Sequence, residues 1–281
     1  MSILTLHKYH GLGNDYLVLD PNQNEVSLQE RKIKMLCQRN FGAGADGILY
    51  GPFMEDGKIK VFIYNPDGSA TGQSGNGVRI FARYLKDFGY VSGSKIVLTT
   101  QSGDAEVEFL DETEYFMRVN MGKADFVAAS APKGSFVHEM INEPLMFHGT
   151  LYNTTCLSVG NPNCVIMTEE VSSKEVKELG PYVENAAYFS ERMNLLLCKV
   201  KSKNRLRIEI YERGAGYTLA SGTGAAAAAA AAFRMGLTEH KMTVEMPGGE
   251  LEVEIDADGT IYMTGGVKRI GTFTIAEDFF S

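Results

Sequence analysis

The sequence has little cysteine, no excess of basic residues and no long apolar run. Its four cysteines are too widely spaced for a CxxC pair and too few for a disulfide framework, so we expect buried free thiols. With 27 Lys and Arg against 35 Asp and Glu in 281 residues, the net charge of −8 argues against nucleic acid or an anionic membrane as partner. No stretch approaches the roughly 18 apolar residues of a membrane helix. The N-terminus lacks a signal-peptide core, and we expect a cytoplasmic protein.

Metal-binding and nucleotide-binding motifs are also missing. Only His7 and His10 lie close together, and no HExxH motif accompanies them, so we expect no metal. Gly42 to Gly47 satisfies GxGxxG, but it follows a predicted helix and leads into a strand-like run, the reverse of a dinucleotide site. Neither Ser74 nor Ser221 has glycine at both −2 and +2, so the nucleophile elbow of hydrolases is excluded.

One basic run stands out in this acidic chain. It has period-2 spacing around a Ser-Lys-Asn turn and consists of Lys199, Lys201, Lys203, Arg205 and Arg207. A polyanion-binding patch is one interpretation. We favour the solvated face of a β-hairpin, because alternating charges flank a turn signal.

Most of what remains is short strand-like runs broken by glycine and Asn/Asp turns, with three helical segments among them. Residues 27–38 form the first predicted helix, with Ser27 as N-cap and Glu30 completing a capping box. Residues 77–88 and 224–235 are the other two. The latter contains eight consecutive alanines, which suit a central helix closely surrounded by strands.

An internal repeat links the last two helices. Each is preceded by the sequence S-G-x-G, once at Ser74 and once at Ser221, and the two are 221 − 74 = 147 residues apart. This is about half the chain, so the repeat predicts two similar halves. We therefore expect an α+β fold of two pseudo-symmetric domains, each a curled sheet around a central helix.

The start of each repeated helix is a candidate anion site. A helix N-terminus carries unpaired N–H donors and the positive end of a dipole, so Gly75-Asn76 and Gly222-Thr223 can each present backbone donors to a carboxylate. If the halves face each other, one carboxylate can receive both sets. This suits proton removal at the neighbouring carbon, whose charge moves onto the carboxylate oxygens. Ser74 and Ser221 would then flank that carbon.

At this point the sequence resembles the diaminopimelate epimerase family. Seven motifs occur in the family's order over nearly the whole chain: His10-Gly11-Leu12-Gly13-Asn14-Asp15-Tyr16, Asn65-Pro66-Asp67-Gly68-Ser69, Gly75-Asn76-Gly77-Val78-Arg79, Gly160-Asn161-Pro162, Arg192-Met193-Asn194, Glu212-Arg213-Gly214-Ala215-Gly216 and Gly222-Thr223-Gly224. The resemblance implies an amino-acid epimerase that uses no cofactor and forms a homodimer. It implies domains of residues 1–121, completed by a strand at 267–281, and 122–266.

The resemblance also implies the roles of the site residues. Family members have cysteine at the positions of Ser74 and Ser221, where one thiolate removes the α-proton and one thiol returns a proton to the opposite face. Glu212 is implied to assist catalysis. The resemblance implies that the substrate is bound by Asn14, Asn65, Gly75, Asn76, Asn161, Asn194, Glu212, Arg213, Gly222 and Thr223. Their chemistry agrees, because guanidinium binds carboxylate, carboxylate binds ammonium, and amides bind either.

Several positions depart from the family's pattern. Serine at both 74 and 221 removes the matched acid and base, since an alkanol is far too weakly acidic to supply a ready base. A deliberate Cys→Ser substitution explains a double loss confined to these positions better than drift does. Asn163 and Tyr217 replace a usual histidine and glutamate. Many members have glutamine at the position of Gly47. Glycine there is expected to leave space beside the substrate.

The leading hypothesis is thus a diaminopimelate epimerase, interconverting the LL and meso forms for lysine and peptidoglycan precursors, disabled at both acid/base positions. One alternative is a racemase of another amino acid, such as histidine, prompted by Asn163, Tyr217 and Gly47. Another is a natural amino-acid-binding protein without catalysis. Arg213 and Glu212 also have a plainer interpretation as an exposed ion pair ending a strand.

Overall fold

The computed structural model describes residues 4–72, 74–111, 113, 115–127 and 138–280, and the chain divides into two compact units. Unit 1 comprises Met1–Val119 and Gly265–Ser281, and unit 2 comprises Asn120–Thr264. Each domain boundary implied by the resemblance lies two residues further along the chain. The chain passes between units within β8 (Phe116–Lys123) and β17 (Thr260–Gly266). None of the helices among the described residues is long and apolar enough to cross a membrane.

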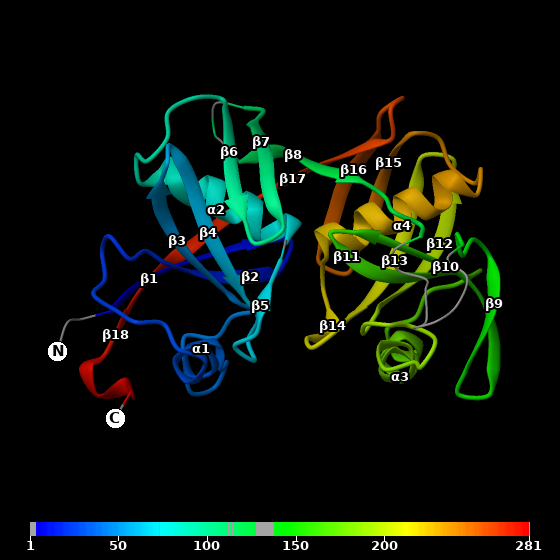
Figure 1. Cartoon of the computed structure of the whole chain (residues 1–281), viewed down its shortest axis with the longest axis horizontal. Coiled ribbons are helices and arrows are strands. Elements are labelled where there is room, and N and C mark those ends of the chain that lie inside the picture. Colours follow the sequence, from blue (N-terminus) through cyan, green and yellow to red (C-terminus); the bar gives the residue numbers. More distant parts are fainter. Residues whose placement is uncertain (1–3, 73, 112, 114, 128–137, 281) are drawn as a thin grey trace. The chain divides into compact units, whose positions relative to one another are not determined.

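The described residues of unit 1 form two α-helices and a succession of strands (Figure 1). Besides β8, its elements are β1 (Leu4–Gly11), β2 (Asn14–Leu19), α1 (Glu30–Cys37), β3 (Ile48–Glu55), β4 (Lys58–Tyr64), β5 (Ala70–Thr71), α2 (Gly75–Asp87), β6 (Lys95–Thr100), β7 (Gly103–Phe109), β18 (Lys268–Ile275) and the 3-10 helix η1 (Glu277–Phe280). Strand β18 pairs with β1, so the C-terminal segment completes the first sheet.

Unit 2 repeats this plan. Besides β17, its elements are β9 (Glu143–Phe147), β10 (Thr150–Val159), β11 (Asn161–Met167), α3 (Ser173–Glu184), β12 (Asn194–Ser202), β13 (Arg205–Glu212), β14 (Gly216–Thr218), α4 (Gly222–Arg234), β15 (Lys241–Met246) and β16 (Gly249–Ile255). Strand β9 pairs with β10 at the edge of this sheet.

The pairing pattern confirms the internal repeat. In unit 1, β1 pairs antiparallel with β2, β2 parallel with β3, β3 antiparallel with β4 and β4 parallel with β6, and β6 and β7 continue antiparallel. In unit 2, β10, β11, β12, β13, β15 and β16 follow the same alternation. Each parallel step is joined by a helix, as parallel neighbours require. The fold is thus two similar α/β halves, as the repeat predicts.

A buried helix lies against the strands of each half. Every residue from Gly222 to Ala232 is buried, and α4 contacts β10, β11, β12, β13, β15 and β16, so strands cover it on all sides. Alanine makes this possible, because larger side chains would hold those strands further away. Helix α2 packs in the same way against β1, β2, β3, β6 and β7, but uses larger side chains such as Phe81 and Tyr84.

The prediction for the first helix is wrong at its start. Helix α1 begins at Glu30 after Gln29, which makes no side-chain cap, and Ser27 lies outside the helix. The Ser27 carbonyl accepts a hydrogen bond from Lys32 Nζ at 3.1 Å, while Glu30 pairs with Lys34 one turn along. The expected capping box is therefore not formed.

Helix α3 is absent from the sequence prediction. The hydroxyl of Ser172 accepts from the backbone N–H groups of Lys174 and Glu175, which is the capping geometry that a Ser-x-x-Glu pattern signals. The repeat points to the same place, since 27 + 147 = 174 and 38 + 147 = 185. Both signals were in the sequence, and the second required applying the repeat to α1.

Two further predictions are confirmed. All four cysteines are free and buried, and burial raises the pKa of the thiols of Cys37 and Cys198 to about 12. Strands β12 and β13 form the expected hairpin at the basic run. Four of its cations pair with glutamates, joining Lys199 to Glu170, Lys201 to Glu245, Arg205 to Glu245 and Glu250, and Arg207 to Glu209. These pairs offset most of the positive charge of the run.

Candidate active site

Ser74 caps helix α2 in unit 1. Its backbone is extended, with φ −135° and ψ 115°, and its Oγ accepts a hydrogen bond from Gly77 N–H at 3.0 Å. The first intrahelical bond runs from Val78 N–H to the Ser74 carbonyl at 2.8 Å. The N–H groups of Gly75 and Asn76 therefore have no acceptor within the helix, as expected for donors aimed at an anion.

A second donor reaches the same oxygen. The hydroxyl of Tyr16, a buried residue of β2, donates to Ser74 Oγ at 3.1 Å. A Cβ added at Gly47 would lie 2.6 Å from Tyr16 Cε1 and 2.4 Å from the Tyr64 carbonyl oxygen. The expectation that Gly47 leaves space beside the substrate is therefore wrong: the ring of Tyr16 occupies the room that glycine provides.

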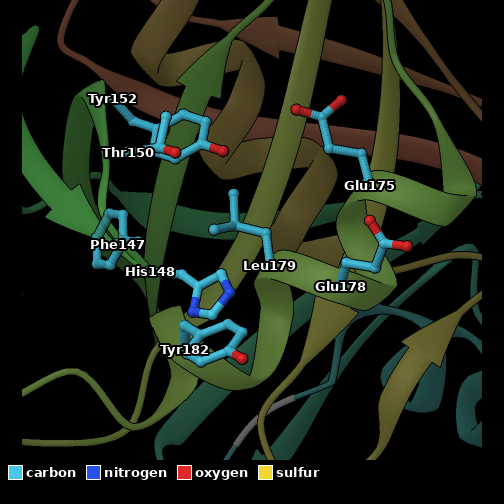
Figure 2. Close-up of a pocket in the computed structure, with 8 residues that line it drawn as sticks. All are labelled: Phe147, His148, Thr150, Tyr152, Glu175, Glu178, Leu179 and Tyr182. Carbon is cyan, nitrogen blue, oxygen red and sulfur yellow. The ribbon is translucent and has the colours of Figure 1, made fainter.

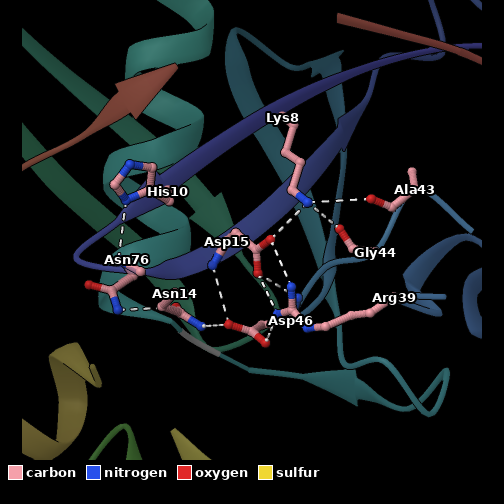
Figure 3. Close-up of polar contacts among 10 residues, drawn as sticks. Lys8, His10, Asn14, Asp15, Arg39, Ala43, Gly44, Asp46 and Asn76 are labelled. Atoms are coloured by element: carbon pink, nitrogen blue, oxygen red, sulfur yellow. Dashed lines mark hydrogen bonds and ion pairs between the residues drawn. The ribbon is translucent and has the colours of Figure 1, made fainter. Parts of the chain in front are cut away.

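Behind α2, two asparagine side chains connect the helix to a charged cluster (Figure 3). The Asn76 amide donates to Asn14 Oδ1 at 3.0 Å and accepts from Arg79 at 2.6 Å, while Asn14 donates to Asp46 at 3.0 Å. All of these except Asp46 are buried. The side chains of Asn14 and Asn76 thus bind other protein groups, and the carboxylate donors expected at Asn76 are on its backbone.

The charged cluster contains two unequal carboxylates. Asp15 pairs with Lys8 and with Arg39, at 2.9 and 2.8 Å. Burial opposes ionisation of Asp15, but the hydrogen bonds and positive charge of Arg39 and Lys8 outweigh it and hold its pKa below the usual value. Burial and the charge of Asp15 instead raise the pKa of Asp46, although Arg39 also contacts it.

Asn65 lies in the turn that follows β4. Its backbone N–H donates to the Ser69 carbonyl at 2.9 Å, and its side-chain amide donates to Ser69 Oγ at 3.0 Å. These bonds fix the Asn-Pro-Asp-Gly-Ser turn. Asn65 is in unit 1, whereas Asn161, Asn194, Glu212 and Arg213, which the resemblance also assigns to the substrate, are in unit 2.

Ser221 caps helix α4 with the same backbone geometry as Ser74. Its φ and ψ are −138° and 122°, and its Oγ accepts from Gly224 N–H at 3.1 Å. The Ser221 hydroxyl donates to Glu212 Oε1 at 2.7 Å. A carboxylate thus stands behind the reacting position, able to accept a proton from the group at 221. Gly222 and Thr223 supply the first-turn N–H groups here.

Beside Glu212, unit 2 brings together three of the predicted binding residues. Asn194 Oδ1 accepts from the backbone N–H of Arg213 at 2.9 Å, and the Arg213 guanidinium donates to Asn161 Oδ1 at 3.2 Å and to Glu191 at 3.3 Å. The Arg213 side chain is 30% exposed, and Glu191 is mostly exposed. The guanidinium is therefore held in place from one side while part of it stays accessible.

The two remaining departures from the family pattern have structural partners. Asn163 is buried, and its side chain donates to the Asn161 carbonyl at 2.6 Å and accepts from Asn194 at 3.1 Å. The Tyr217 hydroxyl donates to Glu209 at 2.8 Å. Burial, together with that hydrogen bond, raises the pKa of Tyr217 to about 12. Asn163 supports the neighbouring binding residues, and Tyr217 holds a carboxylate of the next strand.

A separate pocket on unit 2 contains none of the predicted site residues. It lies between the β9–β10 hairpin and α3, and Phe147, His148, Tyr152, Leu179 and Tyr182 provide most of its lining (Figure 2). The His148 ring stacks on Tyr182 with centroids 4.2 Å apart. Glu175 and Glu178 line one side. Sequence analysis missed this pocket, and it also missed the contact of Tyr16 with Ser74, because no spacing rule links those positions.

Comparison with solved structures defines the class of the fold. A hydroxyproline epimerase from Agrobacterium vitis superposes with a TM-score of 0.76, covering 100% of this chain and 93% of that one at 12% identity. A phenazine biosynthesis protein of the PhzF family from Bacillus anthracis gives a TM-score of 0.65, covering 98% and 100% at 14% identity. The chain has the two-unit fold of amino-acid epimerases and related proteins.

Sequence comparison narrows this to one family. The profile of the diaminopimelate epimerase family matches residues 6–127 and 155–270. Diaminopimelate epimerase 2 of Nostoc sp. is 39% identical over 99% of this chain and 98% of its own length. The diaminopimelate epimerase of Methanothermobacter thermautotrophicus is 35% identical over 95% and 97%. The chain belongs to the diaminopimelate epimerase family.

Proposed function

We propose that this chain binds diaminopimelate, and that its scaffold epimerises this substrate when cysteine occupies positions 74 and 221. The observation that carries the proposal is the linked set in unit 2. Asn161 and Asn194 hold Arg213, and Glu212 in the adjacent position accepts from Ser221. A guanidinium and a carboxylate next to each other suit the carboxylate and ammonium of an amino acid.

The two serines make the chain a binding protein with no appreciable turnover. Proton abstraction from an α-carbon needs a base that is present near neutral pH, and a serine hydroxyl does not supply one. Glu212 can accept the proton of Ser221, but the resulting alkoxide would be strongly disfavoured. We therefore expect ligand binding without exchange of the α-proton. We further propose that the protein acts as a cytoplasmic homodimer without a cofactor.

Exchange with solvent deuterium tests this directly. The parent chain and the Ser74→Cys/Ser221→Cys variant are incubated with LL-diaminopimelate in D2O, and the α-proton signal is followed by NMR. We expect binding by calorimetry and no exchange in the parent, and both exchange and meso product in the variant. Appreciable exchange by the parent at neutral pH would contradict the disabled site.

A substrate panel separates the enzyme alternatives. Tyr217 and Asn163 motivate a racemase of another amino acid, and histidine is the named candidate. Diaminopimelate should be turned over by the cysteine variant far better than histidine or lysine, which lack the distal carboxylate that Arg213 would bind. Preference for histidine would establish the racemase instead. A chain that binds diaminopimelate but stays inactive with both cysteines would be a natural binding protein.

A further inference from the structure

We propose that Tyr16 is a positioning residue for the reacting group at position 74: its hydroxyl donates a hydrogen bond to that group and stabilises its anionic form. The inference rests on the proposed role of position 74 in proton transfer. It adds a residue of β2 to the S-G-x-G pattern at the start of α2. In this proposal Tyr16 does not contact the α-carbon of the substrate, because it acts only through the side chain at position 74.

Two hydrogen-bond donors reach the side-chain oxygen of Ser74. This oxygen accepts from the Tyr16 hydroxyl at 3.1 Å and from Gly77 N–H at 3.0 Å. Two donors therefore converge on one atom, and Ser74 is only half-buried while Tyr16 is 6% exposed. Donors that converge on an atom favour its negatively charged state, and they do so more strongly when shielded from water.

Gly47 leaves the room that the ring of Tyr16 occupies. A Cβ at 47 would clash with the Tyr16 ring at 2.6 Å, so any other residue there would displace the ring or the neighbouring backbone. Glycine at 47 is thus compatible with the placement that brings the tyrosine hydroxyl to Ser74. The residues at 16, 47 and 74 therefore depend on one another, and the glutamine that many family members have at 47 would not fit against this tyrosine.

The corresponding group at Ser221 shows what Tyr16 changes. Ser221 has the same backbone cap but donates to a carboxylate, Glu212, which favours the protonated form of the group at 221. A thiol at 74 should therefore ionise more readily than it would without Tyr16. No atoms are transferred in this proposal, because the hydrogen bond only shifts the protonation equilibrium of the side chain at 74.

The test measures one pKa and needs no activity. Ser74→Cys is made alone and with Tyr16→Phe, which keeps the ring and removes the hydroxyl. The pKa of the thiol introduced at position 74 is obtained from the pH dependence of iodoacetamide alkylation, with the site read by peptide mass. The four native cysteines are buried, so the introduced thiol is expected to dominate the reaction. Tyr16→Phe should raise the pKa of this thiol by about one to two units, a roughly 10- to 100-fold loss of thiolate.

Two controls separate positioning from a general loss of structure. Tyr9→Phe removes another buried tyrosine hydroxyl of unit 1, one that donates to Asp87, and should leave the pKa of the introduced thiol unchanged. Gly47→Ala should raise that pKa alone but add little in the presence of Tyr16→Phe, with thermal melting as the check of folding. A Tyr16→Phe variant that melts normally and leaves the pKa of the introduced thiol within about 0.3 units would overturn the proposal. Failure of diaminopimelate binding or turnover would contradict the proposed function and leave this pKa shift standing.

Discussion

The N-termini of α2 and α4 have the same sequence pattern and nearly the same backbone conformation, yet the capping serines form opposite kinds of hydrogen bond. Ser74 and Ser221 differ by 3° in φ and 7° in ψ, and each accepts from the glycine three residues on. Beyond this, Ser74 accepts from a tyrosine, whereas Ser221 donates to a glutamate. The repeat determines where the reacting groups lie. Residues outside the repeat, Tyr16 and Glu212, give the two groups different hydrogen-bond partners.

The supports behind the two caps differ as well. Unit 1 holds Asn76 through Asn14 and a cluster of charged side chains, with Lys8 and Arg39 around Asp15. Unit 2 holds Arg213 with two amides, Asn194 at its backbone N–H and Asn161 at its guanidinium, and the carboxylate partner Glu191 is largely exposed. A rigid charged support suits donors that must stay in place. A partly exposed guanidinium suits a ligand group that must enter and leave.

The largest expected effect comes from giving both caps a group that can ionise. Ser74→Cys/Ser221→Cys should raise epimerisation from undetectable to measurable, since a matched acid or base contributes about 10²- to 10⁴-fold at each step. Either single change should stay poor, because each direction needs a base on one face and an acid on the other. Coupled assays of LL-to-meso conversion check this. Full activity from one cysteine would refute two-base chemistry. It would show that only one of the two caps carries a reacting group.

The next effect concerns the ligand rather than the reaction. Arg213→Ala should weaken diaminopimelate binding by roughly 30-fold to several thousand-fold, which corresponds to about 2 to 5 kcal/mol for a charged pair losing one partner. Arg234→Ala is the matched control, since Arg234 forms an exposed pair with Glu139. Calorimetry gives the affinity and circular dichroism the fold. Unchanged affinity would make Arg213 structural and favour a substrate without a distal carboxylate.

A third prediction separates the two carboxylates behind α2. Asp15→Asn removes the partner of the largely buried Lys8 and should reduce the free energy of unfolding at neutral pH by about 2 to 4 kcal/mol. Asp46→Asn should cost much less, since burial and Asp15 already disfavour the charge at 46. Urea unfolding of both variants measures the difference. Equal losses would show that the cluster does not distinguish them.

The pH dependence of unfolding has opposite signs for the two residues. The pKa of Asp15 is lowered on folding, so its stabilisation is present above the unfolded pKa of about 3.9 and is lost as pH falls through the folded value. The pKa of Asp46 is raised on folding, so its contribution is present below the unfolded pKa and is lost as pH rises through the folded value. Asp15→Asn should therefore flatten the acid side of the stability curve. Asp46→Asn should remove a loss of stability that the parent shows as the pH rises above about 4.

Much of this organisation could be predicted from the sequence because it is local. The S-G-x-G pattern is a cap followed by glycines that fit a tight first turn, and its recurrence at Ser74 and Ser221 indicated both the repeat and the two sites. Eight alanines indicated a helix that other elements approach closely. The helix at Ser173–Glu184 was also local, through Ser172 and Glu175, and comparison of the halves would have recovered it.

What could not be predicted depends on side chains that meet only after folding. Tyr16 and Ser74 are 58 residues apart, and the hydroxyl reaches the cap because Gly47 lets the ring lie against it. From the sequence, Gly47 indicated empty space, since a missing side chain does not reveal which neighbour fills the room. Ser27 and Glu30 also match a capping pattern, but the helix begins only at Glu30 and the pattern alone did not show this.

The smallest prediction concerns Tyr217, where the family usually has glutamate. If Tyr217 is structural, as its hydrogen bond to Glu209 indicates, Tyr217→Phe should lower the free energy of unfolding by about 1 kcal/mol and leave diaminopimelate affinity unchanged. The loss is small because Glu209 keeps its pair with Arg207 at 2.8 Å. Urea unfolding and calorimetry measure the two quantities on the same preparation. A loss of affinity with normal stability would place Tyr217 at the ligand and contradict its structural role.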